Sequence, residues 1–244
     1  MTIGLIGYGK MGKEIERLAL ERGWKVGVRI TAGSGPLREK DADGVDVGIH
    51  FAAGSAVAGH VEQWSKFRKP LVIGTTGWDD ALNQVKRTVE ESGIGLIYGA
   101  NFSPGIHLFT RLAALAGSLA DRSSEYDIAI HETHHRGKSD SPSGTALMLG
   151  RMLLDRVRRK SELLTGPPKG RIDPKHLQIS SARVGSVVGR HSVTLDSLAD
   201  TIELVHTARS RTGFALGALL AAEWIKTRTG LHTVEELMTN FFGQ

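Results

Sequence analysis

The sequence predicts two domains of different class: an α/β domain with a parallel, doubly wound sheet, and an α+β domain with a mostly antiparallel sheet. Up to about residue 103, short apolar runs alternate with amphipathic helical patterns, which is typical of a parallel sheet covered by helices. Farther along, apolar runs follow one another with only turns between them, which favours antiparallel pairing. The 244 residues suffice for one large or two modest domains.

The first domain is expected to comprise residues 1–103 and 212–244. A strand over residues 3–6 leads into a glycine-rich turn, a helix that Gly23 ends, and a second strand over residues 24–30, which together form a βαβ unit. The remaining expected elements are strands at 46–51, 70–73 and 94–98, helices at 56–67 and 80–92, and an Ala- and Leu-rich C-terminal helix at 213–227 that returns to this domain.

The second domain is expected over residues 104–211. Its expected elements are helices at 105–120 and 143–160 and strands at 126–133, 176–184, 192–197 and 201–208. Glycines and prolines between residues 165 and 175 indicate a loop. Four basic residues close the second helical pattern and are expected to form a solvated helix end: Arg156, Arg158, Arg159 and Lys160.

The absence of cysteine restricts the chemistry open to this chain. It excludes disulfides, thiolate metal sites and cysteine nucleophiles, and it fits a reducing cytoplasm. No run approaches 18 apolar residues, so no membrane segment is expected. The net charge of +5 suits a phosphorylated cofactor or an anionic substrate. Because the four tryptophans are scattered and offer no stacking platform, no nucleic-acid partner is expected.

The pattern Gly7-x-Gly9-x-x-Gly12 has the form of a dinucleotide-binding fingerprint. The first glycine allows a tight turn, the second lets a pyrophosphate approach the backbone, and the third lets the helix pack closely against the strand. An incidental glycine turn is the alternative, but the position between a strand and a helix favours cofactor binding. The residues expected to hold the dinucleotide here are Gly7, Tyr8, Gly9, Lys10, Met11 and Gly12.

The end of the second predicted strand indicates which dinucleotide is used. An acidic residue usually binds the ribose 2′-hydroxyl of NADH at this point, but this chain has Arg29 and Thr31. Both residues tolerate a 2′-phosphate. The sequence therefore predicts that NADPH serves at least as well as NADH, with Arg29 as a cofactor-binding residue.

Two further turns follow predicted parallel strands. Open α/β sheets bind ligands beyond the carboxyl ends of their strands, so these turns are expected to line the nicotinamide. Plain turn chemistry is the alternative. The expected cofactor-binding residues are Gly74, Thr75 and Thr76 in one turn, and Ala100, Asn101 and Phe102 in the other.

The densest polar cluster, residues 131–145, runs from a predicted strand into a predicted helix. A histidine in such a cluster can act as a general acid, and a lysine supplies positive charge. Ser143 suits a helix cap, so the N–H groups of Gly144 and Thr145 are expected to face an anion such as a carboxylate. A solvated loop and a metal site are the alternatives. Adjacent histidines on an extended chain point to opposite faces, so no metal is predicted.

Together these motifs resemble the dihydrodipicolinate reductase family along nearly the whole chain. The family's signature, Glu-x-His-His-x-x-Lys-x-Asp-x-Pro-Ser-Gly-Thr-Ala, is matched from Glu132 to Ala146. The resemblance implies a cytoplasmic homotetramer that uses NADPH or NADH, with substrate contacts and the tetramer interface in the second domain. It also implies roles for particular residues: a proton donor at His134, its catalytic partner at Lys138, and a substrate-binding group of His135, Gly144 and Thr145.

The reaction that the resemblance implies is the reduction of 4-hydroxy-tetrahydrodipicolinate, a cyclic dicarboxylate, by hydride transfer to C4 in diaminopimelate and lysine biosynthesis. The chain departs from the family pattern at two points: the acidic residue after the second strand is missing, and His50-Phe51 stands where the family commonly has Asp-Phe. Another two-domain dehydrogenase and a catalytically idle NAD(P)-sensing regulator are the alternatives, because a fold does not determine a function.

Overall fold

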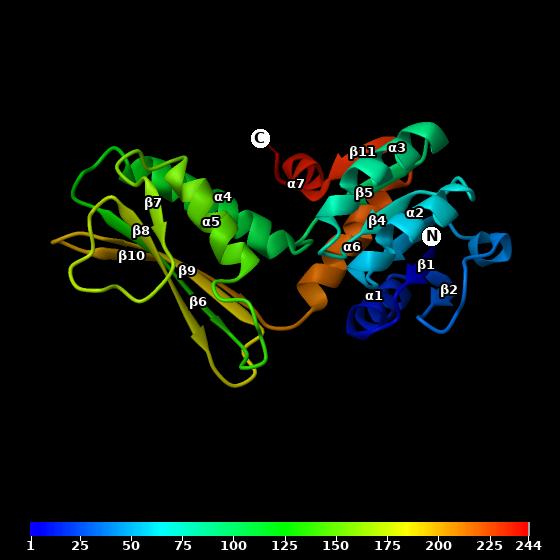
Figure 1. Cartoon of the computed structure of the whole chain (residues 1–244), viewed down its shortest axis with the longest axis horizontal. Helices are drawn as coiled ribbons and strands as arrows, with labels where there is room; N and C mark the ends of the chain where they lie inside the picture. Colours follow the sequence, from blue (N-terminus) through cyan, green and yellow to red (C-terminus); the bar gives the residue numbers. More distant parts are fainter. Residues whose placement is uncertain (244) are drawn as a thin grey trace. The chain divides into compact units, whose positions relative to one another are not determined.

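A computed structural model describes residues 1–243, and residue contacts divide the chain into two units. One unit comprises Met1–Pro104 and Arg211–Gln244, and the other comprises Gly105–Ser210. Each unit has its own sheet and its own hydrophobic core (Figure 1).

The first unit contains a six-stranded parallel sheet, which confirms the predicted α/β class. Its strand order is β11-β5-β4-β3-β1-β2. The strands are β1 (Thr2–Ile6), β2 (Lys25–Ile30), β3 (Val47–His50), β4 (Leu71–Ile73), β5 (Gly95–Tyr98) and β11 (Gly230–Thr233). The helices are α1 (Lys10–Glu21), α2 (Val57–Ser65), α3 (Leu82–Ser92), α6 (Thr212–Ile225) and α7 (Val234–Phe242), with short 3₁₀ turns at Glu39–Ala42, Gly54–Ala56 and Asp79–Ala81.

Helices cover both faces of this sheet because buried side chains alternate along its strands. Ile3 and Leu5 of β1 pack in one cluster with α1, α6 and α7, whereas Ile6 packs in a second cluster with α2 and α3. β2 lies on one side of β1 and β3 on the other. The carboxyl ends of β1 and β3 therefore form a topological switch point, which is where such sheets bind ligands.

The sequence patterns did not predict β11 or α7. β11 reads Gly-Leu-His-Thr, and all four residues are half-buried at the edge of the sheet. Such a short edge strand carries no apolar run. Its place is set by parallel pairing with β5, which the residues of β11 alone do not specify.

The second unit contains a five-stranded mixed sheet with two antiparallel and two parallel strand pairings, so a second sheet is confirmed but a mostly antiparallel one is not. In the order β10-β9-β6-β8-β7, β9 pairs antiparallel with β10 and β6, whereas β8 pairs parallel with β6 and β7. Two connections return the chain to the same end of the sheet, α5 between β6 and β7 and residues 165–175 between β7 and β8, so all three strands run the same way. The strands are β6 (Asp127–His134), β7 (Glu162–Leu164), β8 (His176–Arg183), β9 (Gly189–Asp196) and β10 (Thr201–Ala208).

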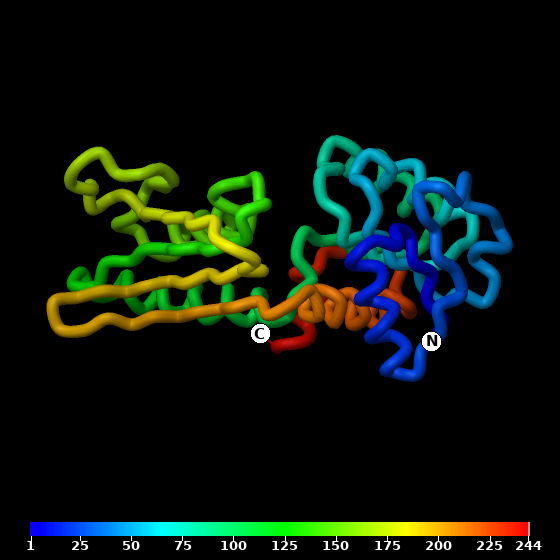
Figure 2. Tube along the Cα trace, turned by 90° about the horizontal axis from the view of Figure 1, so that it is seen from below, coloured from blue at the N-terminus to red at the C-terminus, as the bar shows by residue number. Residues whose placement is uncertain are grey.

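Two helices, α4 (Pro104–Ala120) and α5 (Gly144–Leu154), share one core with this sheet. Phe109 of α4 and Leu149 of α5 are buried together with Ile130 of β6. Figure 1 shows the two helices next to each other along the strands, and Figure 2 shows the β9–β10 hairpin as a yellow-to-orange run. The buried side chains of β6 alternate, so every second residue of this strand faces the helices.

Lys160 contradicts the expectation of a solvated helix end. α5 ends at Leu154, and the Lys160 side chain is only 2% exposed. Its Nζ donates to the carbonyl oxygens of Pro174 (2.8 Å) and His176 (2.9 Å) and lies 2.6 Å from Oδ1 of Asp127. Lys160 therefore holds the start of β8 in place, and sequence position alone did not reveal these partners.

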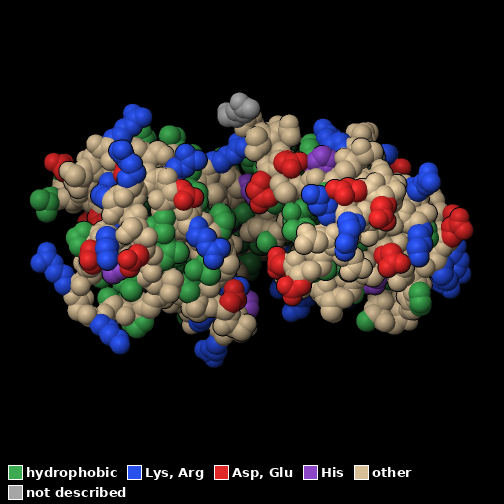
Figure 3. All heavy atoms as spheres, turned by 45° about the horizontal axis from the view of Figure 1, so that its top comes forward, with side chains coloured by type: hydrophobic (Ala, Val, Ile, Leu, Met, Phe, Trp, Pro, Cys, Tyr) green, Lys and Arg blue, Asp and Glu red, His purple; other side chains and the backbone are tan. Residues whose placement is uncertain are grey.

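Among residues 1–243, no helix is long and apolar enough to cross a membrane. On the face displayed in Figure 3, Lys and Arg side chains are interspersed with Asp and Glu. That face therefore lacks the continuous basic stripe that is typical of a surface for nucleic-acid phosphates.

Candidate active site

The glycine turn after β1 is built so that only its middle glycine is open to a ligand. Gly7 has a φ of +99°, and a Cβ there would lie 2.3 Å from the Phe51 carbonyl oxygen. A Cβ at Gly12 would lie 2.4 Å from the Gly7 carbonyl oxygen, whereas a Cβ at Gly9 would meet nothing within 4 Å. Within residues 1–243, no side chain caps α1 at Gly9, so its first N–H groups remain for an anion.

A pocket of about 580 Å³ lies beside this turn. Its position, at the ends of β1, β2 and β3, is where a doubly wound fold holds the adenosine half of a dinucleotide. The pocket is lined by Ile6, Gly7, Tyr8, Gly9, Ile30, Thr31, Ala32, Gly35, Phe51, Ala52, Ala53, Ala56 and His60. Backbone and small side chains dominate this lining, as close approach to a ligand requires.

Arg29 is held by an acidic neighbour. Its guanidinium forms an ion pair with Glu16 and lies 5.7 Å from the centre of the Tyr8 ring. The Tyr8 hydroxyl also hydrogen-bonds with Glu16. The described residues that line the pocket include Tyr8 and Thr31 but not Arg29.

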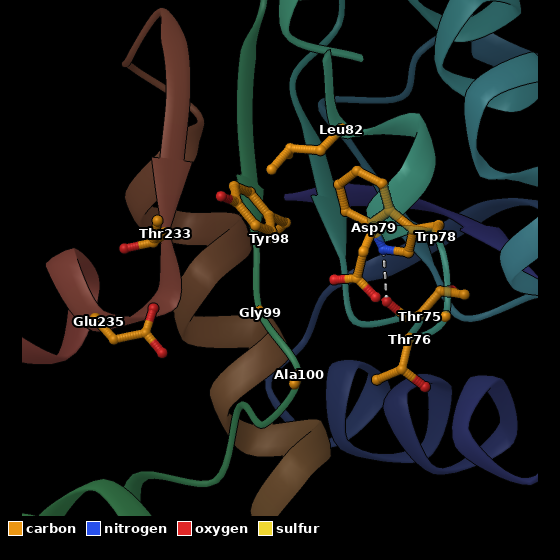
Figure 4. Close-up of a pocket in the computed structure, with 11 residues that line it drawn as sticks. Thr75, Thr76, Trp78, Asp79, Leu82, Tyr98, Gly99, Ala100, Thr233 and Glu235 are labelled. Carbon is orange, nitrogen blue, oxygen red and sulfur yellow. Dashed lines mark hydrogen bonds between the residues drawn. The ribbon is translucent and has the colours of Figure 1, made fainter. Parts of the chain in front are cut away.

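Two further pockets adjoin the turns after β4 and β5. One, of about 440 Å³, has Lys10 and Met11 on one side and Gly74, Thr75 and Thr76 on the other. The other, of about 280 Å³, is lined by residues after β4, at the end of β5 and at the start of α7 (Figure 4). There Trp78 Nε1 donates to the Thr75 carbonyl oxygen at 2.8 Å, Thr233 and Glu235 lie on the opposite side, and Ala100 lies between the two sides, next to Gly99.

Asn101 and Phe102 line none of these described pockets. The Asn101 side chain accepts a hydrogen bond from the Ser103 backbone N–H at 2.9 Å, which shapes the turn. Phe102 is buried in the core, and a Cβ at Gly217 of α6 would lie 1.6 Å from its carbonyl oxygen. In this structure both residues support the strand-end turn.

A buried carboxylate, Glu132, organises the polar cluster of the second unit. Glu132 and His134 lie two residues apart on β6, so they share one face of the strand, and Glu132 pairs across the sheet with His191 of β9. Glu132 Oε2 lies 3.2 Å from His134 Nδ1 and 3.6 Å from His191 Nε2. Its Oε1 accepts from the Ser143 backbone N–H, Ser181 Oγ and Arg183 Nη2, each at 2.9 Å.

The sequence analysis missed Glu132, Arg183 and His191 as functional residues. The signal for Glu132 was available, because alternate residues of an extended strand share a face with His134. The contacts of Arg183 and His191 with Glu132 could not be predicted in this way, because they depend on the register of β8 and β9 against β6.

The cluster shifts the ionisation of its members in opposite senses. Burial raises the pKa of the Glu132 carboxyl, but contacts with His191, Ser143 and Arg183 outweigh burial and hold this pKa well below its usual range. Burial lowers the pKa of His134 to about 4, although the Glu132 carboxylate opposes this change. At neutral pH, Glu132 is therefore an anion and His134 is a neutral ring.

Glu132, His134 and His191 offer ligand atoms within 4.8 Å of one another, which is compatible with a metal ion. Of the three histidines weighed from the sequence, His131, His134 and His135, only His134 belongs to this group, because His131 lies on the other face of β6, where its Nδ1 is 2.8 Å from Ser180 Oγ. The Arg183 guanidinium on the same carboxylate and the nearby Lys138 disfavour a divalent cation. The donor set fits a carboxylate–histidine network better than a metal centre.

The start of α5 lies beside a cation and a carboxylate of the chain, Lys138 and Asp140. Ser143 caps this helix by accepting from the Ala146 N–H at 3.2 Å, and a Cβ at Gly144 would meet nothing within 4 Å. Lys138 Nζ lies 2.7 Å from Asp140 Oδ1. Hydrogen bonding from Lys138 is the main cause that lowers the pKa of Asp140, and the Gly144 N–H contributes. A carboxylate of the chain itself thus already contacts the cation and the helix start.

A doubly wound unit with a glycine turn, together with a unit that holds a buried histidine–carboxylate network, defines a two-domain nicotinamide-dependent oxidoreductase. Two family models match nearly the whole chain: dihydrodipicolinate reductase, N-terminus, over residues 1–102, and dihydrodipicolinate reductase, C-terminus, over residues 105–238. The chain belongs to the dihydrodipicolinate reductase family. This family uses NAD(P)H, and its N-terminal domain binds the dinucleotide.

Individual relatives agree with this assignment. The chain is 34% identical over 242 residues, 99% of each chain, to the 4-hydroxy-tetrahydrodipicolinate reductase of Christiangramia forsetii. It is 32% identical over 235 residues, 91% of this chain and 83% of the relative, to that of Neisseria meningitidis serogroup C. A dipicolinate-bound dihydrodipicolinate reductase from Paenisporosarcina sp. TG-14 has the same fold, with a TM-score of 0.74 at 21% identity over 96% of this chain and 97% of that one.

Proposed function

We propose that this chain reduces 4-hydroxy-tetrahydrodipicolinate to tetrahydrodipicolinate with NADPH or NADH, as a step of diaminopimelate and lysine biosynthesis. The observation that carries the proposal is that the His134 ring lies against the Glu132 carboxylate, close to Lys138 and to Gly144 at the start of α5. This arrangement combines a titratable ring, a cation and an anion site. Family membership along both units supports the same reaction and does not favour an idle regulator.

The residues of the first unit fit a dinucleotide, because the open Gly9 and the uncapped start of α1 form a cradle that a side chain would fill. Gly7 to Gly12 would hold the pyrophosphate, while Gly74 to Thr76 and Ala100 would border the nicotinamide. The 4-hydroxyl group of the substrate would leave as water to give a conjugated cyclic imine, and the cofactor, when bound, would supply the hydride that adds to C4 of this imine, with one proton completing the reduction. Asn101 and Phe102 would act through the shape of their turn.

In the second unit, Gly144 and Thr145 would bind a substrate carboxylate through their N–H groups, and His135 would contact the second carboxylate. The incoming carboxylate takes the place of Asp140 at the helix start, which frees the ammonium group of Lys138 to face the substrate. Positive charge at that point stabilises electron density that develops on the ring nitrogen.

His134 and Lys138 share the task of supplying a proton. In the free chain, Glu132 faces Nδ1 of His134, and burial keeps the ring neutral. A dianionic substrate raises the pKa of His134, so a proton is taken up as the substrate binds. The protonated ring or the Lys138 ammonium then donates to the substrate.

A direct assay tests this function. Freshly generated dihydrodipicolinate synthase product is mixed with the protein, and the oxidation of NADPH and of NADH is followed separately. We expect oxidation of both cofactors, with a KM for NADPH no higher than that for NADH. The absence of oxidation with either cofactor would reject the proposal.

Glu16 provides a test of cofactor preference. Because Glu16 pairs with Arg29, the Glu16→Gln substitution should free the guanidinium for a 2′-phosphate while Gln still bonds to the Tyr8 hydroxyl. The ratio of KM for NADPH to KM for NADH is expected to fall about threefold. An unchanged ratio would remove Arg29 from the cofactor site.

We also propose that the chain works as a homotetramer in the cytoplasm, assembled through its second unit. α4 and α5 cover one face of the sheet, and Leu204 of β10 packs against that core, whereas Val205, on the other face of the strand, is an exposed apolar side chain. Light scattering coupled to size-exclusion chromatography measures the mass directly. A tetramer is expected, and Val205→Asp should dissociate it, whereas a tetramer that persists in this variant would remove β10 from the interface.

A further inference from the structure

The chain between β6 and α5, residues 135–143, forms a loop that carries Lys138, and we call it the Lys138 loop. Its start is bonded to the turn between β8 and β9, because the Arg136 backbone N–H donates to the Gly185 carbonyl oxygen at 3.1 Å. Figure 1 shows the loop beside this turn. Residues 138–142 belong to no helix or strand, so contacts with the rest of the second unit decide where Lys138 lies.

Arg183, at the end of β8, bonds the middle of the Lys138 loop to the sheet. Its Nη2 donates to Glu132 Oε1 at 2.9 Å and also donates to the Asp140 backbone carbonyl oxygen. Its Nη1 donates to the Ala182 carbonyl oxygen at 2.8 Å. The Arg183 side chain is only 17% exposed, and the Glu132 side chain is fully buried. Because a guanidinium is planar, these acceptors together fix its orientation.

Asp140 connects Arg183 with Lys138 through two different groups. Its backbone carbonyl accepts from Arg183, whereas its carboxylate lies 2.7 Å from Lys138 Nζ. A substrate carboxylate that displaced the Asp140 side chain would leave the backbone carbonyl bonded to Arg183. The backbone that carries Lys138 would therefore keep its place while the partner of the Lys138 ammonium changes.

The same guanidinium also contacts the residue that supports His134. Glu132 uses Oε1 for Arg183, and its Oε2 lies 3.2 Å from His134 Nδ1. His134 belongs to β6 and Lys138 to the loop that follows, so Arg183 bonds to both segments at once. The relative placement of a proton source and a positive charge matters for catalysis, because a displacement of about 1 Å can lower a rate about 100-fold.

We propose that Arg183 is a positioning residue, which holds the Asp140 carbonyl and the Glu132 carboxylate on one guanidinium and thereby fixes Lys138 relative to His134. This inference deepens the proposed function and rests on it for the roles of Lys138 and His134. In this role Arg183 acts on turnover through Lys138 and does not touch the substrate.

The first experiment asks whether Arg183 orders the Lys138 loop, and it needs no substrate. Arg183→Lys keeps a positive charge beside Glu132, but the shorter side chain cannot bond both acceptors. Hydrogen exchange followed by mass spectrometry should show that the amides of residues 137–141 exchange about tenfold faster than in the wild type. Residues 129–133, which pair with strands on both sides, should stay protected. Unchanged exchange in the loop, or lost protection in β6 as well, would overturn the proposal.

The second experiment identifies the residue through which Arg183 acts. Arg183→Lys should lower kcat about tenfold and leave the dissociation constant for NADPH within about twofold of the wild-type value. In a Lys138→Ala background the same substitution should change kcat by less than about twofold, because the group that Arg183 positions is gone. In a His134→Ala background the tenfold loss should remain. Equal losses in the two backgrounds would contradict an action through Lys138.

Arg158→Lys is the matched control for both experiments. Arg158 also lies in the second unit, but its ion pair with Asp121 is largely exposed and includes no residue of the Glu132 cluster. The substitution should change neither the exchange of the Lys138 loop nor kcat. If Arg158→Lys and Arg183→Lys lower kcat equally, the effect of Arg183 is not specific and the proposal fails.

Nitrogen-15 NMR of the wild-type chain needs no variant to fold. The Nη hydrogens of Arg183 should give separate signals, because their hydrogen bonds block rotation of the guanidinium. A single averaged signal would show that Arg183 holds neither acceptor. If the wild-type chain oxidises neither cofactor with the substrate, the proposed function fails, and the exchange and NMR results still decide whether Arg183 orders the loop.

Discussion

The two units differ in the chemical groups with which they would bind a ligand. The first unit offers backbone: three glycines, the start of α1 and small side chains surround its main pocket. The second unit offers buried charge: one carboxylate, Glu132, contacts partners from β6, β8, β9 and the start of α5. A backbone cradle can lose binding without losing the fold, whereas a buried charged network serves both the fold and the chemistry.

Substitution of the proposed catalytic pair should produce the largest effect. His134→Ala and Lys138→Ala are each expected to lower kcat about 100-fold or more, because each removes a proton source or a positive charge at the reacting ring. The dissociation constant for NADPH should change by less than about twofold, because the dinucleotide residues lie in the first unit. Steady-state kinetics and cofactor titration measure both quantities. Unchanged turnover in either variant would remove that residue from the mechanism.

Glu132→Gln tests whether the Glu132 carboxylate is needed both for the stability of the fold and for the reaction. The amide keeps the size of the side chain but loses the charge that Arg183 and His134 contact, so urea unfolding should show a loss of about 3 kcal/mol. Turnover should fall with it, because His134 loses the partner of Nδ1.

The control for Glu132→Gln is Ser181→Ala, which removes one neutral hydrogen bond and should cost only about 1 kcal/mol. Equal losses in the two variants would contradict the central role of the carboxylate charge.

Two glycines of one turn sharpen the contrast between binding and folding. Gly12→Ala places a Cβ 2.4 Å from the Gly7 carbonyl oxygen and should destabilise the chain by about 2 kcal/mol. Gly9→Ala meets nothing within 4 Å, so its stability should stay within about 0.5 kcal/mol of the wild type while the dissociation constant for NADPH rises about tenfold. Thermal unfolding with and without NADPH distinguishes the two, and a destabilised Gly9→Ala chain would count against an open cradle.

The last prediction concerns the pH dependence of stability, which has no effect at neutral pH. His50 has a folded pKa of about 3 against about 6.5 in an unfolded chain, so below pH 6.5 only the unfolded chain takes up this proton. Stability is therefore highest above pH 6.5 and falls as the pH decreases, by about 2 kcal/mol from His50 alone between pH 7 and pH 5. His50→Gln cannot take up this proton, so its unfolding free energy should decline less over that interval. An equal decline in both chains would show that His50 is not buried as a neutral ring.

The same contrast explains how much could be predicted from the sequence. The glycine turn and the strand-end turns are runs of neighbouring residues, so Gly7 to Gly12 and Gly74 to Thr76 could be found from the pattern alone, and the structure brings them to three neighbouring pockets. His191 and Arg183 reach Glu132 only through strand register. The parallel pairing of β6 with β8 was missed for the same reason, because the role of α5 as a crossover is a property of the assembled sheet.

The contacts of Glu132 also limit which amino-acid substitutions this protein can tolerate. A single amino-acid change at a residue that four elements share disturbs every one of them at once, so few such changes leave a viable enzyme. Few single substitutions could therefore give resistance to an inhibitor whose binding depends on the groups that Glu132 contacts. An inhibitor that depends on the open Gly9 cradle would meet a target that a single methyl group can alter.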